Sequence, residues 1–190
     1  MVSPVLHDLL RPQLLVLRLL WTALTVSIAI YVAVAWLVVA EGPLAGEAPP
    51  AVALVLGAVA LTTVVLSFLV PRLLLSDERL RALVADASPD VERLAVDPRT
   101  QQVDPERQRR LAQLSPGERR LLPVAAAAQA PLVVRLALNE AVAIFGFVLA
   151  LLTGDVAALL PFAAVALVLN VLAWPRLDPL LERARTVAPA

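Results

Sequence analysis

The chain has 190 residues, of which 60% are hydrophobic, and sixteen basic residues balance sixteen acids. Soluble domains are about 45–50% apolar, so this composition predicts an integral membrane protein. A net charge of zero gives no general attraction to nucleic acid, which is not an expected partner. The absence of cysteine excludes disulfides, thiolate nucleophiles and zinc–thiolate sites. All basic residues are arginine, which indicates a GC-rich bacterial genome.

Four apolar segments are long enough to cross a hydrocarbon core about 30 Å thick, which takes about twenty helical residues. These segments are 17–40, 51–71, 131–153 and 156–174. The first is too long for a signal-peptide core and lacks a strongly basic leader, so we expect a retained anchor.

The predicted fold is all-α, an integral membrane four-helix bundle built from two transmembrane hairpins, 17–75 and 124–175. A short helical loop, 76–123, connects the hairpins. Two tails, 1–16 and 176–190, complete the chain.

Arginine is absent from the two connections that join the helices within each hairpin, 41–50 and 153–155. Arginines concentrate instead in the loop and at both ends of the chain. The positive-inside bias therefore places the loop and both termini in the cytoplasm of a bacterium, with the protein in the inner membrane.

The loop is rich in charged residues, glutamine and proline, and it contains three helix starts. Ser76 precedes two acids, Asp104 precedes a proline at the first helical position, and Ser115 has capping-box spacing to Glu118. None of these helices carries enough apolar surface for a core of its own. We expect short amphipathic helices that lie against the membrane or against each other, with their charges solvated and paired among themselves.

Glu140 lies inside the third predicted span, where an ionisable residue is a functional-site candidate by default. Counting about 1.5 Å per residue from Asp155 places it about 22 Å from the outer boundary, in the inner third of the bilayer. The same count puts three further polar residues at about 22–26 Å, so that each span contributes to one polar layer. These residues are Thr25, Ser67 and Asn170.

Three arginines fall at the cytoplasmic edge, about 30–35 Å from the outer boundary, where their side chains can extend outward or fold back toward Glu140. They are Arg18, Arg72 and Arg135. Together with Glu140, Asn139 and the polar layer they form the candidate polar site. In the structural interpretation, one of these arginines and Asn170 hold Glu140. In the functional interpretation, an unpaired Glu140 binds and releases a proton or a cation.

Small and polar residues follow a helical stripe on three of the spans. The stripes are Ala53, Gly57, Ala60, Val64 and Ser67; Arg135, Asn139, Ala143, Gly146 and Ala150; and Ala163, Ala166, Asn170 and Ala173. Small residues let helix backbones approach closely and let polar groups hydrogen-bond across the interface. Glu140 flanks the second stripe and is therefore expected to face a partner helix.

No catalytic constellation is visible in the sequence. Its only histidine, His7, precedes the first span, and there is no HExxH, Gly-x-Ser-x-Gly or glycine-rich phosphate motif. We therefore expect no enzymatic activity, no catalytic or metal-binding residues and no cofactor.

The third span carries a short resemblance. Residues 136–152, in which Glu140 precedes an alanine and lies six residues before Gly146, resemble the ion-carrying helix of rotary ATPase proteolipid subunits. The resemblance implies that Glu140 matches the ion-binding carboxylate of that family. The whole architecture is similar to small, uncharacterised four-span bacterial inner-membrane proteins, a likeness that implies topology but no activity.

Two functions follow as hypotheses. The leading one is a structural or accessory membrane protein that contacts a partner through its cytoplasmic loop and termini. The competing one is an oligomeric proton or cation transporter, or a translocating subunit, in which Glu140 titrates. Beyond Tyr31, Thr62 and Thr63, no polar group lines a route from Glu140 to the outside, which favours the first. Expected partners are the lipid bilayer and either another membrane protein or a second copy of the chain.

Overall fold

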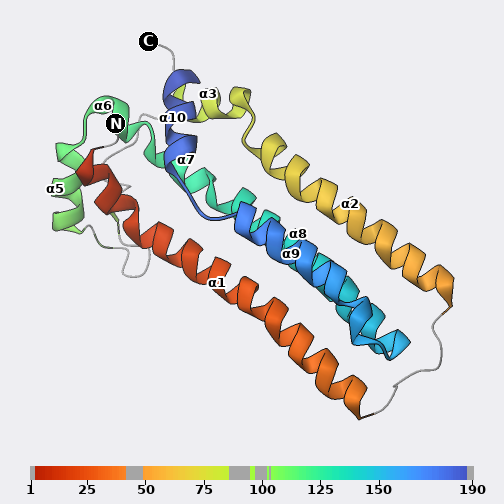
Figure 1. Cartoon of the computed structure of the whole chain (residues 1–190). Coiled ribbons are helices and arrows are strands. Elements are labelled where there is room, and N and C mark those ends of the chain that lie inside the picture. The colour runs from red at the N-terminus through yellow and green to blue at the C-terminus, as the bar shows by residue number, and fades with distance from the viewer. Residues whose placement is uncertain (1–2, 42–48, 86–94, 97–101, 103, 188–190) are drawn as a thin grey trace. The chain divides into compact units, whose positions relative to one another are not determined.

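The computed structural model describes residues 3–41, 49–85, 95–96, 102 and 104–187. The regular elements of these residues are helices, without a strand, which confirms the predicted all-α class. The α-helices, labelled in Figure 1, are α1 (Pro4–Ala40), α2 (Pro50–Leu74), α3 (Asp77–Ala85), α5 (Pro105–Gln113), α6 (Pro116–Arg119), α7 (Leu122–Ala127), α8 (Gln129–Thr153), α9 (Leu160–Leu172) and α10 (Asp178–Val187); a 3-10 turn, η1 (Val156–Ala158), precedes α9.

The chain divides into two compact units. The second unit comprises Arg18–Leu73 and Pro131–Pro175, and the first unit comprises the residues before, between and after these ranges. The segments predicted as tails and loop thus share the first unit, and most of the two predicted hairpins forms the second, although residues 74–75 and 124–130 of those hairpins belong to the first unit. Both tails contain helix, because α1 already begins at Pro4 and α10 occupies most of the C-terminal segment.

Three helical stretches of the described residues are long and apolar enough to cross a membrane: Pro4–Ala40, Pro50–Ala85 and Pro116–Thr153. They indicate a membrane location for the protein. The fourth predicted span, 156–174, is a shorter apolar helix, because the 3-10 turn precedes α9 and Leu172 ends it. That segment stays a prediction as a membrane span.

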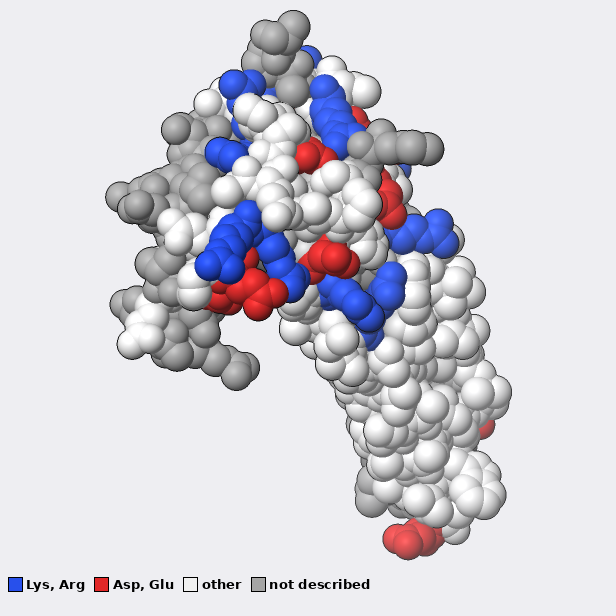
Figure 2. All heavy atoms as spheres, turned by 90° about the vertical axis from the view of Figure 1, so that its left-hand side faces the viewer, with Lys and Arg blue, Asp and Glu red and all other residues white. Residues whose placement is uncertain are grey.

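Most of the apolar surface of these helices is not covered by the rest of the chain. In the most apolar windows of the three stretches only 11%, 17% and 39% of the residues are buried. Figure 2 shows charged side chains gathered over the first unit, whereas the face of the second unit in view is almost free of charge along the helices. A large contiguous apolar surface marks contact with lipid or with another apolar partner.

Small residues form the helix contacts of the second unit. Its buried core includes Ala35 of α1, Ala60 of α2, Ala143 of α8 and Ala166 of α9. The predicted stripes on α8 and α9 are confirmed from Asn139 onward, where every member is buried. The stripe on α2 is confirmed only in part, since Ala60 and Ser67 are buried but Ala53 is exposed.

The first unit has a hydrophobic core of its own. Buried side chains of α3, α5 and α7 pack there with buried side chains from the start of α1 and from α10. The helices of the loop carry too little apolar surface for a core of their own, as predicted from the sequence. The structure supplies that surface from both ends of the chain, through residues such as Leu6 and Leu181, which are 0% and 1% exposed.

All three predicted helix starts in the loop are confirmed. α3 begins after Ser76, Asp104 caps α5, and Ser115 and Glu118 form the predicted capping box at α6. Glu118 also reaches beyond its own helix, because its Oε1 accepts a hydrogen bond of 3.1 Å from the backbone nitrogen of Ser3. This contact ties the start of α1 to α6.

Glu118 should make the stability of the chain depend on pH in the acidic range. Hydrogen bonds from Ser3, followed by those from Ser115, lower the pKa of Glu118 from 4.5 to about 2, because they favour the ionised carboxylate, while partial burial opposes them. A carboxylate whose pKa is depressed in the folded state stabilises that state, and this stabilisation is complete when the pH is above the ordinary pKa. That stabilisation is lost as the pH falls from about 4.5 to about 2.

We expect Glu118→Ala to lower the free energy of unfolding at pH 7 by about 1 kcal/mol, the usual value of a helix cap. The loss should shrink between pH 4.5 and 2, as measured by chemical unfolding of the full chain in detergent. Glu106→Ala is the control, since Glu106 pairs only with Arg110 on an exposed helix face, where such pairs contribute about 0.3–0.5 kcal/mol. An equal loss for both variants, at every pH, would contradict the assignment.

Candidate functional site

Glu140 of α8 is bound by two hydroxyl groups of α1. Its Oε1 accepts hydrogen bonds of 2.8 Å from Ser27 Oγ and 2.8 Å from Tyr31 Oη. Ser27 Oγ also lies 2.8 Å from the carbonyl oxygen of Leu24. Because a serine hydroxyl carries a single hydrogen, it can donate to Glu140 or to Leu24, but not fully to both.

This geometry accepts either protonation state of Glu140. As a carboxylate, Glu140 accepts from both hydroxyl groups. As a carboxylic acid, it can donate to Ser27 Oγ, whose hydrogen then turns to Leu24, while Tyr31 continues to donate to Glu140. The two hydroxyl groups can therefore hydrogen-bond the Glu140 side chain as donors or, in the case of Ser27, as an acceptor.

Asn139, the neighbour of Glu140 on α8, joins this helix to α9. Its Nδ2 donates a hydrogen bond of 3.0 Å to Asn170 Oδ1, and both side chains are 0% exposed. Trp21 Nε1 of α1 donates to the backbone oxygen of Asn170 at 2.7 Å. We call these residues the polar network: Trp21, Ser27, Tyr31, Asn139, Glu140 and Asn170. The polar network connects α1, α8 and α9 through hydrogen bonds.

The asparagine pair is only half satisfied. Asn139 Oδ1 and Asn170 Nδ2 are buried and have no hydrogen-bond partner. A buried polar atom without a partner costs about 1–3 kcal/mol. The side-chain hydrogen bonding between the two asparagines thus consists of a single hydrogen bond, in addition to the apolar packing of α8 on α9.

The predicted partners of Glu140 differ from the observed ones. From the sequence, the carboxyl group was predicted to be held by Arg18, Arg72 or Arg135, together with Asn170. Within the described residues no ion pair joins Glu140 to any of the three arginines, and its hydrogen bonds go to α1. Asn170 instead pairs with Asn139.

Two of the arginines lie over aromatic rings of the second unit. The Arg18 guanidinium carbon is 5.8 Å from the ring centroid of Trp174, and that of Arg135 is 5.2 Å from the ring centroid of Phe68. Both distances are within the range of a cation–π interaction. The arginines are therefore held at the aromatic side chains rather than folded back to Glu140.

Thr25 and Ser67 do not take part in the polar network. Thr25 Oγ1 donates to the carbonyl oxygen of Trp21 at 2.8 Å, and Ser67 Oγ donates to that of Val64 at 2.9 Å. Each hydroxyl group is thus satisfied by its own helix. The predicted depth of these two residues gave no indication of this.

Three members of the polar network were not assigned to the site from the sequence. Ser27 and Tyr31 are four residues apart, so they share one face of α1, and this spacing is the signal that could have found them. Trp21 carried no comparable signal, because its contact is with a backbone oxygen.

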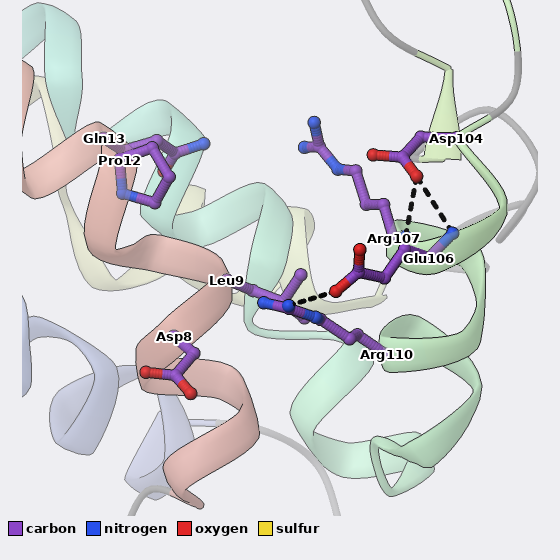
Figure 3. A pocket seen from close by; sticks show the side chains of 8 residues that line it. All are labelled: Asp8, Leu9, Pro12, Gln13, Asp104, Glu106, Arg107 and Arg110. Atoms are coloured by element: carbon purple, nitrogen blue, oxygen red, sulfur yellow. Dashed lines mark hydrogen bonds and ion pairs between the residues drawn. The ribbon is translucent and has the colours of Figure 1, made fainter.

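The first unit contains an open pocket of about 470 Å³ between the start of α1 and α5. Its lining is mixed in charge and includes Asp8 and Gln13 of α1 and Arg107 and Arg110 of α5. In Figure 3, Arg110 reaches Glu106 on its own helix, Arg107 points across the pocket toward Gln13, and Asp8 lies apart from both arginines. α5 thus pairs its one acid, Glu106, with one of its three arginines.

The described residues do not bring together the donor groups of a metal site. Among the residues that the structure describes, no three histidine, aspartate or glutamate side chains come together in a way that could hold a metal ion.

Comparisons of the chain with protein families, with curated proteins and with solved structures give no significant match.

Proposed function

We propose that this chain is a non-enzymatic multi-pass protein of the bacterial inner membrane, which contacts a partner through its cytoplasmic first unit. In this proposal α1, α2, α8 and α9 all cross the bilayer. The stretch Val156–Leu172 is about 25 Å long when helical, a few ångströms less than the hydrocarbon core. The hydrophobic surface of the second unit supports immersion in lipid.

The distribution of charge supports the proposed orientation. The second unit has one arginine on each of three helices: Arg18, where the α1 residues of this unit begin, Arg72, near the end of α2, and Arg135, early in α8. Glu41 and Asp155 stand at the opposite ends of these helices. The positive-inside bias then places the first unit in the cytoplasm.

The observation that carries the structural role is that the polar network is satisfied largely within one chain. Glu140, Asn139 and Asn170 each bind another helix of the same unit. Hydrogen bonds of this kind fix how helices pack in a membrane, at about 0.6 kcal/mol each on average and up to about 1.7. The described surface of the first unit, with its mixed charges, is left to meet a partner.

Substitutions of Glu140 test this role. Glu140→Gln keeps an oxygen that can accept from Ser27 and Tyr31, so we expect the free energy of unfolding to change by less than about 0.5 kcal/mol. Glu140→Ala removes the hydrogen bonds to α1, leaving Tyr31 without its acceptor and Ser27 with the Leu24 carbonyl oxygen alone, and should cost about 1–2 kcal/mol. Chemical unfolding in detergent measures both, and Glu41→Gln, an exposed glutamate at the end of α1, is the control.

A second candidate function, proton or cation translocation by an oligomer, is favoured by one observation. The Glu140 geometry accommodates both protonation states, as a proton-carrying group requires. Proteoliposomes with an imposed membrane potential and an internal pH dye separate the two functions. Proton flux that is lost in Glu140→Gln and kept in Glu41→Gln would establish translocation and overturn the structural proposal. Equal flux in the parent and both variants supports the structural role.

A further inference from the structure

Arg72 and Arg135 form an arginine pair without a counter-charge. Arg135 begins the membrane part of α8, and Arg72 ends that of α2. The Arg135 guanidinium lies over the ring of Phe68, which is one helical turn before Arg72 on the same side of α2, so the two arginines are neighbours. The ion pairs found among the described residues, Arg110 with Glu106 and Arg183 with Asp77, both lie in the first unit.

Arg135 is not free to reach water with its whole side chain. It is partly buried, its guanidinium lies over Phe68, and its Nε is buried without a hydrogen-bond acceptor. Burial of a charged donor is costly unless an acceptor is present. Arg135 Nε therefore lacks an acceptor within the chain, and an anionic acceptor would also offset the repulsion between the two arginines.

The chemistry of the missing acceptor can be stated. A phosphate offers several oxygens and a negative charge, and guanidinium groups bind it through paired, charge-assisted hydrogen bonds. In the proposed orientation Arg72, near the end of α2, and Arg135, early in α8, stand at the cytoplasmic edge of the bilayer, where lipid headgroups lie. Each arginine near a membrane surface contributes about 1 kcal/mol to binding of anionic lipid.

We propose that Arg72 and Arg135 bind the phosphate of an anionic phospholipid between α2 and α8. The lipid phosphate completes the hydrogen bonding of Arg135 and neutralises the pair. This site rests on the membrane location of the helices and is independent of Glu140. A failure of the Glu140 experiments therefore leaves it standing.

The test is native mass spectrometry of the full chain, titrated with phosphatidylglycerol or with phosphatidylcholine of the same acyl chains. We expect the parent to prefer phosphatidylglycerol, with the affinity falling about fivefold in Arg72→Gln or Arg135→Gln and about 25-fold in the double variant. Arg18→Gln is the matched control, since it removes the same charge from another helix. Arg135→Lys, which keeps the charge, should bind better than Arg135→Gln and tests the site should the glutamine variant fold poorly.

Three results would overturn the proposal. The first is a double variant that binds phosphatidylglycerol as the parent does. The second is a loss of affinity in Arg18→Gln as large as that in Arg135→Gln, and either of these two results means general surface attraction. The third is that millimolar inorganic phosphate stabilises the lipid-free parent through both arginines and, in a separate measurement, displaces phosphatidylglycerol from the lipid-bound parent. This result would assign the site to free phosphate.

Discussion

Replacing Gly146 by alanine is expected to force α8 and α9 apart and to lower the free energy of unfolding by about 1–3 kcal/mol, as overpacking of a close contact does. A Cβ at this position would lie 2.5 Å from Phe162 Cβ and 2.8 Å from Phe162 Cγ. Carbon atoms do not approach so closely. Because Phe162 Cβ is attached directly to the backbone of α9, no rotamer change removes the clash, and the helix itself must move.

Gly57 of α2 provides the matched control for Gly146. A Cβ on Gly57 meets nothing within 4 Å. Gly57→Ala should therefore leave stability unchanged or raise it by about 0.5–1 kcal/mol, because alanine loses less conformational freedom than glycine in a helix. Chemical unfolding of both variants in one detergent, followed by circular dichroism, makes the comparison. The close-contact account is wrong if Gly146→Ala is as stable as the parent, or if both variants lose stability equally.

The apolar helices could be predicted because their signal is local. Length and hydrophobicity alone identified 17–40, 51–71 and 131–153, which lie within α1, α2 and α8, and spacing alone identified the buried face of α9. The core of the first unit could not be found in this way. It joins Leu6, Leu80 and Leu181, which are far apart in sequence, and each segment by itself is too short to reveal a buried face.

The same contrast holds within the polar network. Asn139 and Asn170 lie at nearly equal distances from the turn that contains Asp155. In an antiparallel hairpin with a short turn, residues equally far from the turn lie opposite each other, so the count from Asp155 that put Glu140 and Asn170 at one depth also explains why Asn139, the neighbour of Glu140, meets Asn170. The contact of Glu140 with Ser27 and Tyr31 crosses between helices separated by about half the chain. Neither hydrophobicity nor spacing fixes which face of α1 meets α8, and arginines were the more obvious partners by charge.

The asparagine pair should show strong energetic coupling. Leucine has nearly the branched shape of asparagine, so Asn139→Leu removes the hydrogen bond of 3.0 Å to Asn170 and leaves the Asn170 side chain without a partner. We expect a loss of about 1–3 kcal/mol in the free energy of unfolding, the cost of a buried polar group left unpaired. Asn170→Leu should cost a similar amount for the same reason. Trp21 binds the backbone oxygen of Asn170, so its contact persists in both variants.

The double variant, Asn139→Leu with Asn170→Leu, separates a specific pair from two independent polar residues. Replacing both partners by apolar groups of the same shape can be nearly neutral, and here it also removes the two unpaired amide atoms. We therefore expect the double variant to be more stable than either single variant, with a coupling energy of about 1–3 kcal/mol in the double-mutant cycle. Losses that simply add would mean that the two side chains do not act as a pair. Because the cycle compares variants in one detergent, it isolates the contact between α8 and α9 from the contribution of Glu140.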